Sequence, residues 1–253
     1  MKINWKGAAF IILILLFWQG GSIVGIFNES LFPSPLKVFS TFLDLLYSGE
    51  ILVDISTSVW RVIVGLVVGS ALGIIFGLLV GRIFWLDKTI SLTLNIIRAL
   101  PPVAIIPLMI IWFGIGDNAK LIEIAFAVFF PVWVSTVMGV KSINENYLRI
   151  ARIFVKSRTQ FLCKVLIPAT IPFITNGVRI GIAIAFIMAF VSELAGASSG
   201  LGYRIAYAQI IYRADIMLVA LIILGLLAAA TDCAFVYSYT QIFPWVNSVS
   251  KGE

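Results

Sequence analysis

The chain has 253 residues, of which 61% are hydrophobic and only 12% are charged, and its mean hydropathy is +1.08. This composition excludes an ordinary soluble domain and predicts an all-α membrane protein that crosses the bilayer several times. The net charge of +6 does not indicate nucleic-acid binding, because the basic residues lie between the apolar stretches. With no His and only two Cys, we expect no cofactor, no metal site and no His-based acid–base catalysis.

Six apolar stretches are long enough to cross roughly 30 Å of hydrocarbon as helices. We expect these six transmembrane helices at residues 8–26, 58–81, 89–112, 121–140, 172–192 and 216–236. With the N-terminus inside, the inner loops carry eleven Lys and Arg and the outer loops carry four. Because positive residues accumulate on the cytoplasmic side, this asymmetry predicts a multi-pass protein of the cell (inner or plasma) membrane with both termini cytoplasmic.

The first stretch allows two interpretations. Lys2 and Lys6 before the apolar run Ala8–Trp18 are typical of a signal peptide, and also of a signal anchor that stays in the protein. No clear small-x-small cleavage triplet follows the run, and this favours the anchor.

A short amphipathic segment follows the motif Pro33-Ser34-Pro35. Apolar side chains recur at helical spacing between Val38 and Leu46, which predicts an interfacial helix on the outer surface. We therefore assign residues 1–56 to an N-terminal transmembrane helix and this interfacial helix. Residues 57–245 form the main transmembrane domain, and 246–253 form a cytoplasmic tail.

The second span carries a glycine at every fourth position: Gly65, Gly69, Gly73, Gly77 and Gly81. This spacing places the glycines on one helix face, where the missing side chains let another backbone approach closely. The pattern predicts a packing face inside the bundle, and a homodimer seam is the alternative.

The third span is interrupted, because Pro101, Pro102 and Pro107 follow Arg98. Broken helices and buried charge at membrane depth are tolerated where protein or water surrounds them. The break therefore indicates either a substrate path or a plain kink.

Charged side chains within the other spans are few. Arg179 lies in the fifth span and Asp232 in the sixth, both near the inner ends, with Glu123 and Glu193 near outer ends. Because an unpaired charge there would be costly, we expect Arg179 and Asp232 to form an ion pair or to share a polar network, and a separation beyond about 8 Å would exclude this.

The loop 141–171 is the most basic segment of the chain, since one third of all Lys and Arg lie between residues 141 and 168. Within it, residues 146–154 have the pattern of a short amphipathic helix. Such a helix can lie on anionic lipid or dock into a groove of a soluble partner. Pro168 is expected to end one element before Pro172 starts the fifth span.

Four long segments resemble the transmembrane permease subunit of a type I ABC importer, of the branch that handles nitrate, sulfonate and taurine. They are residues 32–50, 58–81, 98–120 and 193–225, including the run Gly196–Gly202 and Arg213 with Asp215. The resemblance covers nearly everything except the last dozen residues. It implies the six-helix bundle of that family.

In that family a cytoplasmic E-A-A-x-x-x-G loop couples the permease to its ATPase. Here Arg149 stands in place of the Glu, Ile150 in place of the first Ala, and Val155 in place of the Gly, whereas Ala151 and Pro168 match. Val155 disfavours the left-handed turn that Gly allows, so either the helix extends or the turn is built differently. The resemblance assigns ATPase coupling to Tyr147, Leu148, Arg149, Ile150, Ala151, Arg152, Phe154 and Pro168.

The resemblance further implies ATPase subunits, a second permease copy or paralogue, an extracytoplasmic solute-binding protein and surrounding membrane lipid as partners. The chain contains no G-x-x-x-x-G-K-[ST] loop, so ATP is bound elsewhere and the chain is not an enzyme. We expect the translocation path to include Arg98, Pro101, Pro102, Glu193 and Ser198.

The expected solute is a sulfonate such as taurine or an alkanesulfonate, or another small anion such as nitrate. Aromatic or pyrimidine compounds related to thiamine precursors are the alternative within the same branch. A secondary transporter would usually show an internal repeat, which the spans do not. A non-transporting scaffold is the remaining class, and only the departures in the coupling loop favour it.

Overall fold

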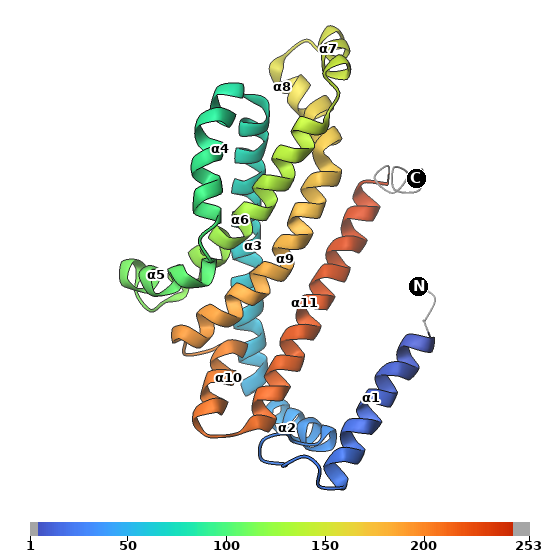
Figure 1. The fold of residues 1–253 in the computed structure, drawn as a ribbon, viewed down its shortest axis with the longest axis vertical. Coiled ribbons are helices and arrows are strands. Elements are labelled where there is room, and N and C mark those ends of the chain that lie inside the picture. The colour runs from blue at the N-terminus through green and yellow to red at the C-terminus, as the bar shows by residue number, and fades with distance from the viewer. Residues whose placement is uncertain (1–4, 245–253) are drawn as a thin grey trace.

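The structure is a computed structural model that describes residues 5–244, and within that range the chain forms helices and no strand. The predicted tail 246–253 lies outside the described residues. The helices are α1 (Trp5–Ile23), α2 (Pro35–Tyr47), α3 (Glu50–Arg82), α4 (Phe84–Arg98), η1 (Pro102–Ile105), α5 (Ile106–Phe113), α6 (Asp117–Ser142), α7 (Glu145–Phe154), α8 (Arg158–Phe161), η2 (Leu162–Leu166), α9 (Ile167–Gly196), α10 (Leu201–Ile210) and α11 (Ala214–Ile242). Figure 1 shows α7 and α8 at one end of an elongated bundle and α2 and α10 at the other.

Four helices in the described range are long and apolar enough to cross a membrane: α3, α6, the continuous helix Arg158–Gly196 that contains α9, and α11. They contain the second, fourth, fifth and sixth predicted spans. The first predicted span corresponds to α1, whose apolar part Ala9–Ile23 is shorter. The multi-pass prediction is thereby confirmed, although two of the six spans differ from simple crossing helices.

The third predicted span, 89–112, is two helices and not one. The axes of α4 and of the η1–α5 segment meet at 83°, and Pro101 at the junction is extended with φ −60° and ψ 123°. Pro lacks the N–H that a continuing helix needs and disfavours helical backbone in the residue before it, so the helix ends at Arg98. Figure 1 shows the break about midway along the bundle, with α5 projecting to the side.

The centre of the bundle is α6, which packs against α3 on one side and α9 on another. A Cβ on Gly73 would lie 2.8 Å from the Phe129 carbonyl oxygen of α6, and one on Gly77 would lie 2.5 Å from the Thr136 Cβ. The glycine ladder is therefore a packing face within the bundle, as predicted. The homodimer alternative is wrong, because α6 of the same chain already covers this face.

The predicted interfacial helix is α2. Ser34 caps it by accepting a hydrogen bond from the Lys37 amide, and Pro35 occupies the first turn, where a missing N–H is tolerated. The Thr41 hydroxyl donates a 2.8 Å hydrogen bond to the Asp215 carboxylate, which also pairs with Arg213 at 2.6 Å. This network fastens α2 to the start of α11.

Candidate functional site

The end of the bundle formed by α7 and α8 carries the predicted coupling segment. Asn144 caps α7 by accepting a hydrogen bond from the Asn146 amide, and Glu145 and Arg152 lie in its first and last turns. These charges have the signs that the helix dipole favours at each end. Leu148 is 4% exposed and packs with Val140, Phe161, Val165 and Leu166, so one side of α7 is anchored to the bundle.

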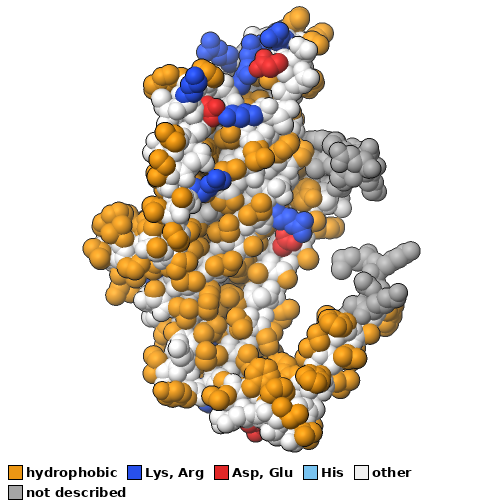
Figure 2. Space-filling view, in the orientation of Figure 1, with side chains coloured by type: hydrophobic (Ala, Val, Ile, Leu, Met, Phe, Trp, Pro, Cys, Tyr) orange, Lys and Arg blue, Asp and Glu red, His pale blue; other side chains and the backbone are white. Residues whose placement is uncertain are grey.

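The other side of α7 leaves an apolar stripe uncovered. Tyr147, Ile150, Ile153 and Phe154 are all exposed, Ile153 at 81% and Phe154 at 78%. Figure 2 shows apolar side chains at this tip next to a concentration of Lys and Arg. An apolar stripe ringed by charge, on a short helix outside the spanning part, is typical of a docking surface for a partner protein.

The two departures from the family pattern have visible structural consequences. Val155 ends α7 in extended conformation, with φ −108° and ψ 136°, so the turn needs no left-handed residue and the helix does not extend. The chain then turns by donating from the Lys156 amide to Gln160 Oε1, and Ser157 caps α8. Arg149 is exposed, and its Nε lies 3.9 Å from Glu145 within the same helix.

Pro168 does not end an element, contrary to the sequence prediction. α8, η2 and α9 form one continuous helix, Arg158–Gly196, and η2 is a π-helical segment in which the Ile167 amide donates to the Leu162 carbonyl. Because Pro168 has no N–H, the wider turn just before it lets the helix continue despite the missing donor. Pro172 likewise lies inside α9.

At the opposite end, a buried charge network joins α3, α6, α9 and α10. The Arg61 side chain is 4% exposed and donates to Glu193 at 2.9 Å, to Asp117 at 2.6 Å and to the Ser199 carbonyl at 2.8 Å. Glu193 also accepts hydrogen bonds from the Ser58 hydroxyl and, at 2.9 Å, from the Gly202 amide. Donors of the protein therefore reach both oxygens of this buried carboxylate, which offsets the cost of burying it.

The same network caps the start of α10. The amides of Gly200, Leu201 and Gly202 donate to Asp54, Ser58 and Glu193, each at 2.9 Å. A helix N-terminus has unpaired amides and favours nearby negative charge, so these acceptors satisfy both needs. Gly200 has φ +121°, and a Cβ there would lie 2.5 Å from the Glu193 carboxylate, so this position requires glycine.

Arg204 extends the network along α10. Its side chain donates to Asp54 at 2.6 Å and to Glu50 at 2.5 Å. Burial works to lower the pKa of Arg204, but the hydrogen bonds and charges of Asp54 and Glu50 outweigh it and raise that pKa. Arg204 therefore stays charged and paired.

Of the side chains in this network, only Glu193 is predicted from the sequence as a site residue. Glu50, Asp54, Ser58 and Arg61 recur at intervals of three or four, which places them on one face of α3, in line with the glycine ladder that begins at Gly65. A polar stripe at helical spacing in an otherwise apolar helix was the signal that could have found them.

The residues predicted for the translocation path lie on different elements. Arg98, at the end of α4, and Pro101 are exposed, and Pro102 is half-buried in η1. Glu193 is held in the buried network, and Ser198 is exposed between α9 and α10. Among the described residues, no hydrogen bond or ion pair joins the break after α4 to Glu193, so their shared role stays a prediction.

The predicted ion pair between Arg179 and Asp232 is confirmed. The guanidinium donates twice, Nε to Oδ1 at 2.8 Å and Nη2 to Oδ2 at 2.9 Å, joining α9 to α11. The Arg179 side chain is 54% exposed although it lies in an apolar helix. Within the described residues, no group of His, Cys, Asp or Glu side chains could hold a metal ion.

Comparisons with known proteins give a consistent result. The sequence profile of a family described as "Binding-protein-dependent transport system inner membrane component" matches residues 69–242. A Bacillus subtilis protein named as an aliphatic sulfonates transport permease protein, SsuC, is 30% identical over 96% of this chain and 88% of its own length. The taurine transport system permease protein TauC of Escherichia coli is 26% identical over 94% of this chain and 88% of its own.

Among solved structures, an inward-facing conformation of the MetNI methionine ABC transporter contains a chain with the same fold. The TM-score is 0.61 at 20% identity, covering 78% of this chain and 97% of that one. At this identity the likeness concerns the fold alone.

Proposed function

The chain belongs to the family of binding-protein-dependent transport system inner membrane components, the permease subunits of ABC importers, and we propose that it carries a small sulfonate across the membrane. It has the fold of a type I importer permease and is a transport subunit, not an enzyme. The observation that carries the substrate proposal is the likeness to relatives named for aliphatic sulfonates and for taurine, which extends over almost the whole chain.

Uptake by the reconstituted complex tests the substrate class. The permease is placed in liposomes with the ATPase and the solute-binding protein that co-purify with it, and ATP-dependent uptake of labelled taurine and of an alkanesulfonate is measured. We expect uptake of at least one of these, with unlabelled sulfonates competing and nitrate competing weakly. Uptake that only nitrate or a pyrimidine blocks would overturn the sulfonate proposal and leave the permease assignment intact.

The ATPase subunits dock on the apolar stripe of α7. Their movement on ATP binding and hydrolysis is transmitted to the bundle through this contact. In support, Leu148 anchors one side of α7 to the bundle, while Tyr147, Ile150 and Phe154 are exposed on another side. A helix that transmits movement from a partner to the bundle needs both a contact surface and a firm attachment. This arrangement makes the α7 end cytoplasmic. Four segments precede α7 (α1, α3, α4 with α5, and α6) and two follow it (α9 and α11), so both termini lie on the same side as α7. ATPase closure would then move the bundle as a rigid body between inward and outward openings.

A carboxylate at Ala151 tests this coupling. Ala151 is half-buried against the hydrophobic cluster that includes Leu148 and Val155. In Ala151→Glu the new carboxylate can be solvated only if α7 moves away from this cluster. We expect sulfonate uptake to fall by roughly tenfold or more, equivalent to about 1.4 kcal/mol of coupling, while ATP hydrolysis persists. Thr159→Glu, which adds the same charge at an exposed position of α8, serves as the matched control.

The solute path runs past Arg98, Pro101 and Pro102 at the broken helix and past Glu193 and Ser198 at the far end. An arginine beside helix ends freed by a break supports passage of an anion. Glu193 would reach the solute only in a conformation that separates α3 from α10, because its oxygens are occupied in this one.

A second permease copy or a paralogue covers the face that carries Arg179 and Asp232. An exposed ion pair on two spanning helices is unfavourable against lipid and is expected where protein or a water-filled path surrounds it. Purification of the intact complex with a tag on this chain decides between a second copy and a paralogue. One permease species indicates a second copy, and two species indicate a paralogue.

A further inference from the structure

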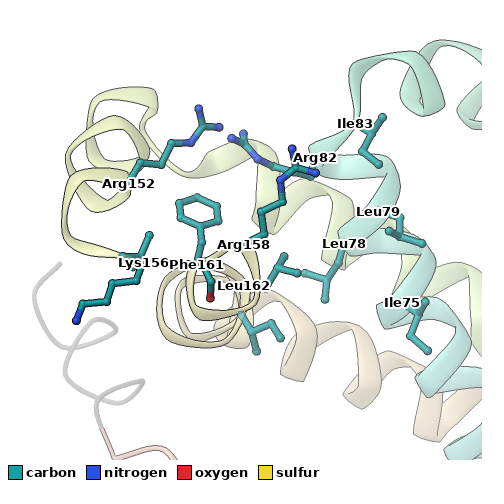
Figure 3. Close-up of a pocket in the computed structure, with 13 residues that line it drawn as sticks. Ile75, Leu78, Leu79, Arg82, Ile83, Arg152, Lys156, Arg158, Phe161 and Leu162 are labelled. Carbon is teal, nitrogen blue, oxygen red and sulfur yellow. The ribbon is translucent and has the colours of Figure 1, made fainter.

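A cavity of about 840 Å³ lies beside the coupling segment, between the end of α3, the end of α7 and α8. Its lining has two parts of different chemistry. Apolar side chains of α3 form one wall, and basic side chains line the part of the cavity around Phe161 (Figure 3). The basic lining residues are Arg82, Arg152, Lys156 and Arg158, and the lining contains no Asp or Glu.

Three of the basic groups gather at one place. Figure 3 shows the guanidinium groups of Arg82, Arg152 and Arg158 turned toward one another, whereas Lys156 points away. Arg82 and Arg152 each lie 5.7 Å from the centre of the Phe161 ring, which holds them in place by cation–π attraction. None of the three forms an ion pair with any carboxylate in the part of the chain that the structure describes.

Among the described residues, the protein itself supplies no counter-charge to these three guanidiniums. Like charges that converge without a counter-charge repel one another, so a cluster of three guanidiniums is stable only when an anion or much water lies between them. Guanidinium forks match the oxygens of a phosphate group, each able to donate two parallel hydrogen bonds. The chemistry of the cluster therefore suits a phosphate.

The apolar wall decides which phosphate compound fits. Ile75, Leu79 and Ile83 line the cavity and are about half exposed, at 52%, 46% and 43%. They belong to the last turns of the spanning helix α3 and to the residue that follows it, so this wall continues the bilayer-facing surface of that helix up to the basic cluster. A soluble phosphate leaves such a wall wet, whereas a lipid covers it with its acyl chains.

We propose that this cavity is a binding site for one anionic phospholipid of the cytoplasmic leaflet, with its phosphate between Arg82, Arg152 and Arg158 and its acyl chains along α3. The bound lipid bridges the end of a spanning helix to the coupling helix α7. Its presence neutralises the cluster and fixes the position from which α7 meets its partner. This site adds a lipid requirement that does not depend on which solute is carried.

Native mass spectrometry of the intact permease released from nanodiscs tests the proposal, with phosphatidylglycerol and phosphatidylethanolamine present in equal amounts. The wild type is expected to retain one phosphatidylglycerol selectively. In Arg82→Gln/Arg158→Gln the retention should weaken roughly 25-fold, because each basic residue near anionic lipid contributes about fivefold. Arg82→Lys/Arg158→Lys should keep most of the binding.

The control is Lys88→Gln/Lys164→Gln, which removes the same charge from exposed positions outside the cavity lining and should bind as the wild type does. Equal loss in this control would reduce the effect to general surface charge and overturn the proposal. Displacement of the lipid by glycerol phosphate alone would identify a soluble-anion site and overturn it too. Unchanged lipid retention in Arg82→Gln/Arg158→Gln, with loss of ATPase co-purification, would assign the cavity to the ATPase.

Discussion

The two ends of the molecule use basic residues in opposite ways. At the α10 end, Arg61 and Arg204 are almost fully buried and each has two carboxylate partners. At the α7 end, Arg82, Arg152 and Arg158 converge beside an open cavity without a carboxylate partner among the described residues. The same side-chain type therefore fastens helices together at one end and remains available for partners at the other.

The difference follows from what surrounds each group. A buried charge costs several kcal/mol unless it is paired, on the order of 3–5 kcal/mol when one partner is removed, so burial selects for complete networks. Charges at the exposed tip are solvated and need no partner to be tolerated. Basic residues of the tip can therefore bind an ATPase or a lipid, whereas those of the α10 end are already paired within the fold.

Removing Arg61 should have the largest effect of the changes considered. Arg61→Gln leaves Glu193 and Asp117 without their cation, and Glu193 is buried, so we expect a loss of about 3–5 kcal/mol in the free energy of unfolding. Denaturant titration of the purified protein in micelles measures it. The double change Arg61→Gln/Glu193→Gln should recover part of the loss, and a double variant as unstable as the sum of both single ones would contradict a direct pair.

A change in the glycine ladder should have an intermediate effect. Gly73→Ala places a methyl group 2.8 Å from the Phe129 carbonyl and must push α3 away from α6, at a cost of about 1–3 kcal/mol. Gly225→Ala is the matched control, because nothing lies within 4 Å of its added methyl group. Since Ala favours helix over Gly, this control should be neutral or slightly stabilising, and equal destabilisation of both variants would contradict the packing role.

The smallest effect on stability is expected at Arg149 of the exposed tip. Its only ion pair with a described residue is a 3.9 Å contact with Glu145 in the same helix, and both side chains are about three-quarters exposed. Arg149→Gln should leave the unfolding transition where it is, because surface pairs of this kind add little. Its effect should appear in the affinity for the ATPase, measured by co-purification at increasing salt. A shift in the unfolding transition comparable to that of Arg61→Gln would contradict the conclusion that arginines stabilise the fold at the α10 end and not at the α7 end.

Local patterns were sufficient for the spanning segments, the break in the third span and α7. Hydropathy predicted the spanning segments, because crossing a bilayer requires a length of apolar helix that no tertiary contact can supply. The prolines after Arg98 predicted the break, since a missing N–H acts within one turn. The amphipathic pattern around Leu148 predicted α7, and the spacing of Gly65 to Gly81 predicted a close helix contact.

Pairing across the chain was beyond the sequence, with one exception. Arg179 and Asp232 could be matched because few other charges were available within the spans. Arg61 and Glu193 lie 132 residues apart, and helical periodicity states which face a residue occupies but not which helix faces it. The tertiary structure likewise decided that a π-helical turn before Pro168 lets the helix continue, and that arginines from α3 and α7 meet over one aromatic ring. Hydrophobicity and backbone chemistry thus determined where this chain crosses the membrane and bends, whereas packing alone decided which of its charges hold the fold and which stay open to partners.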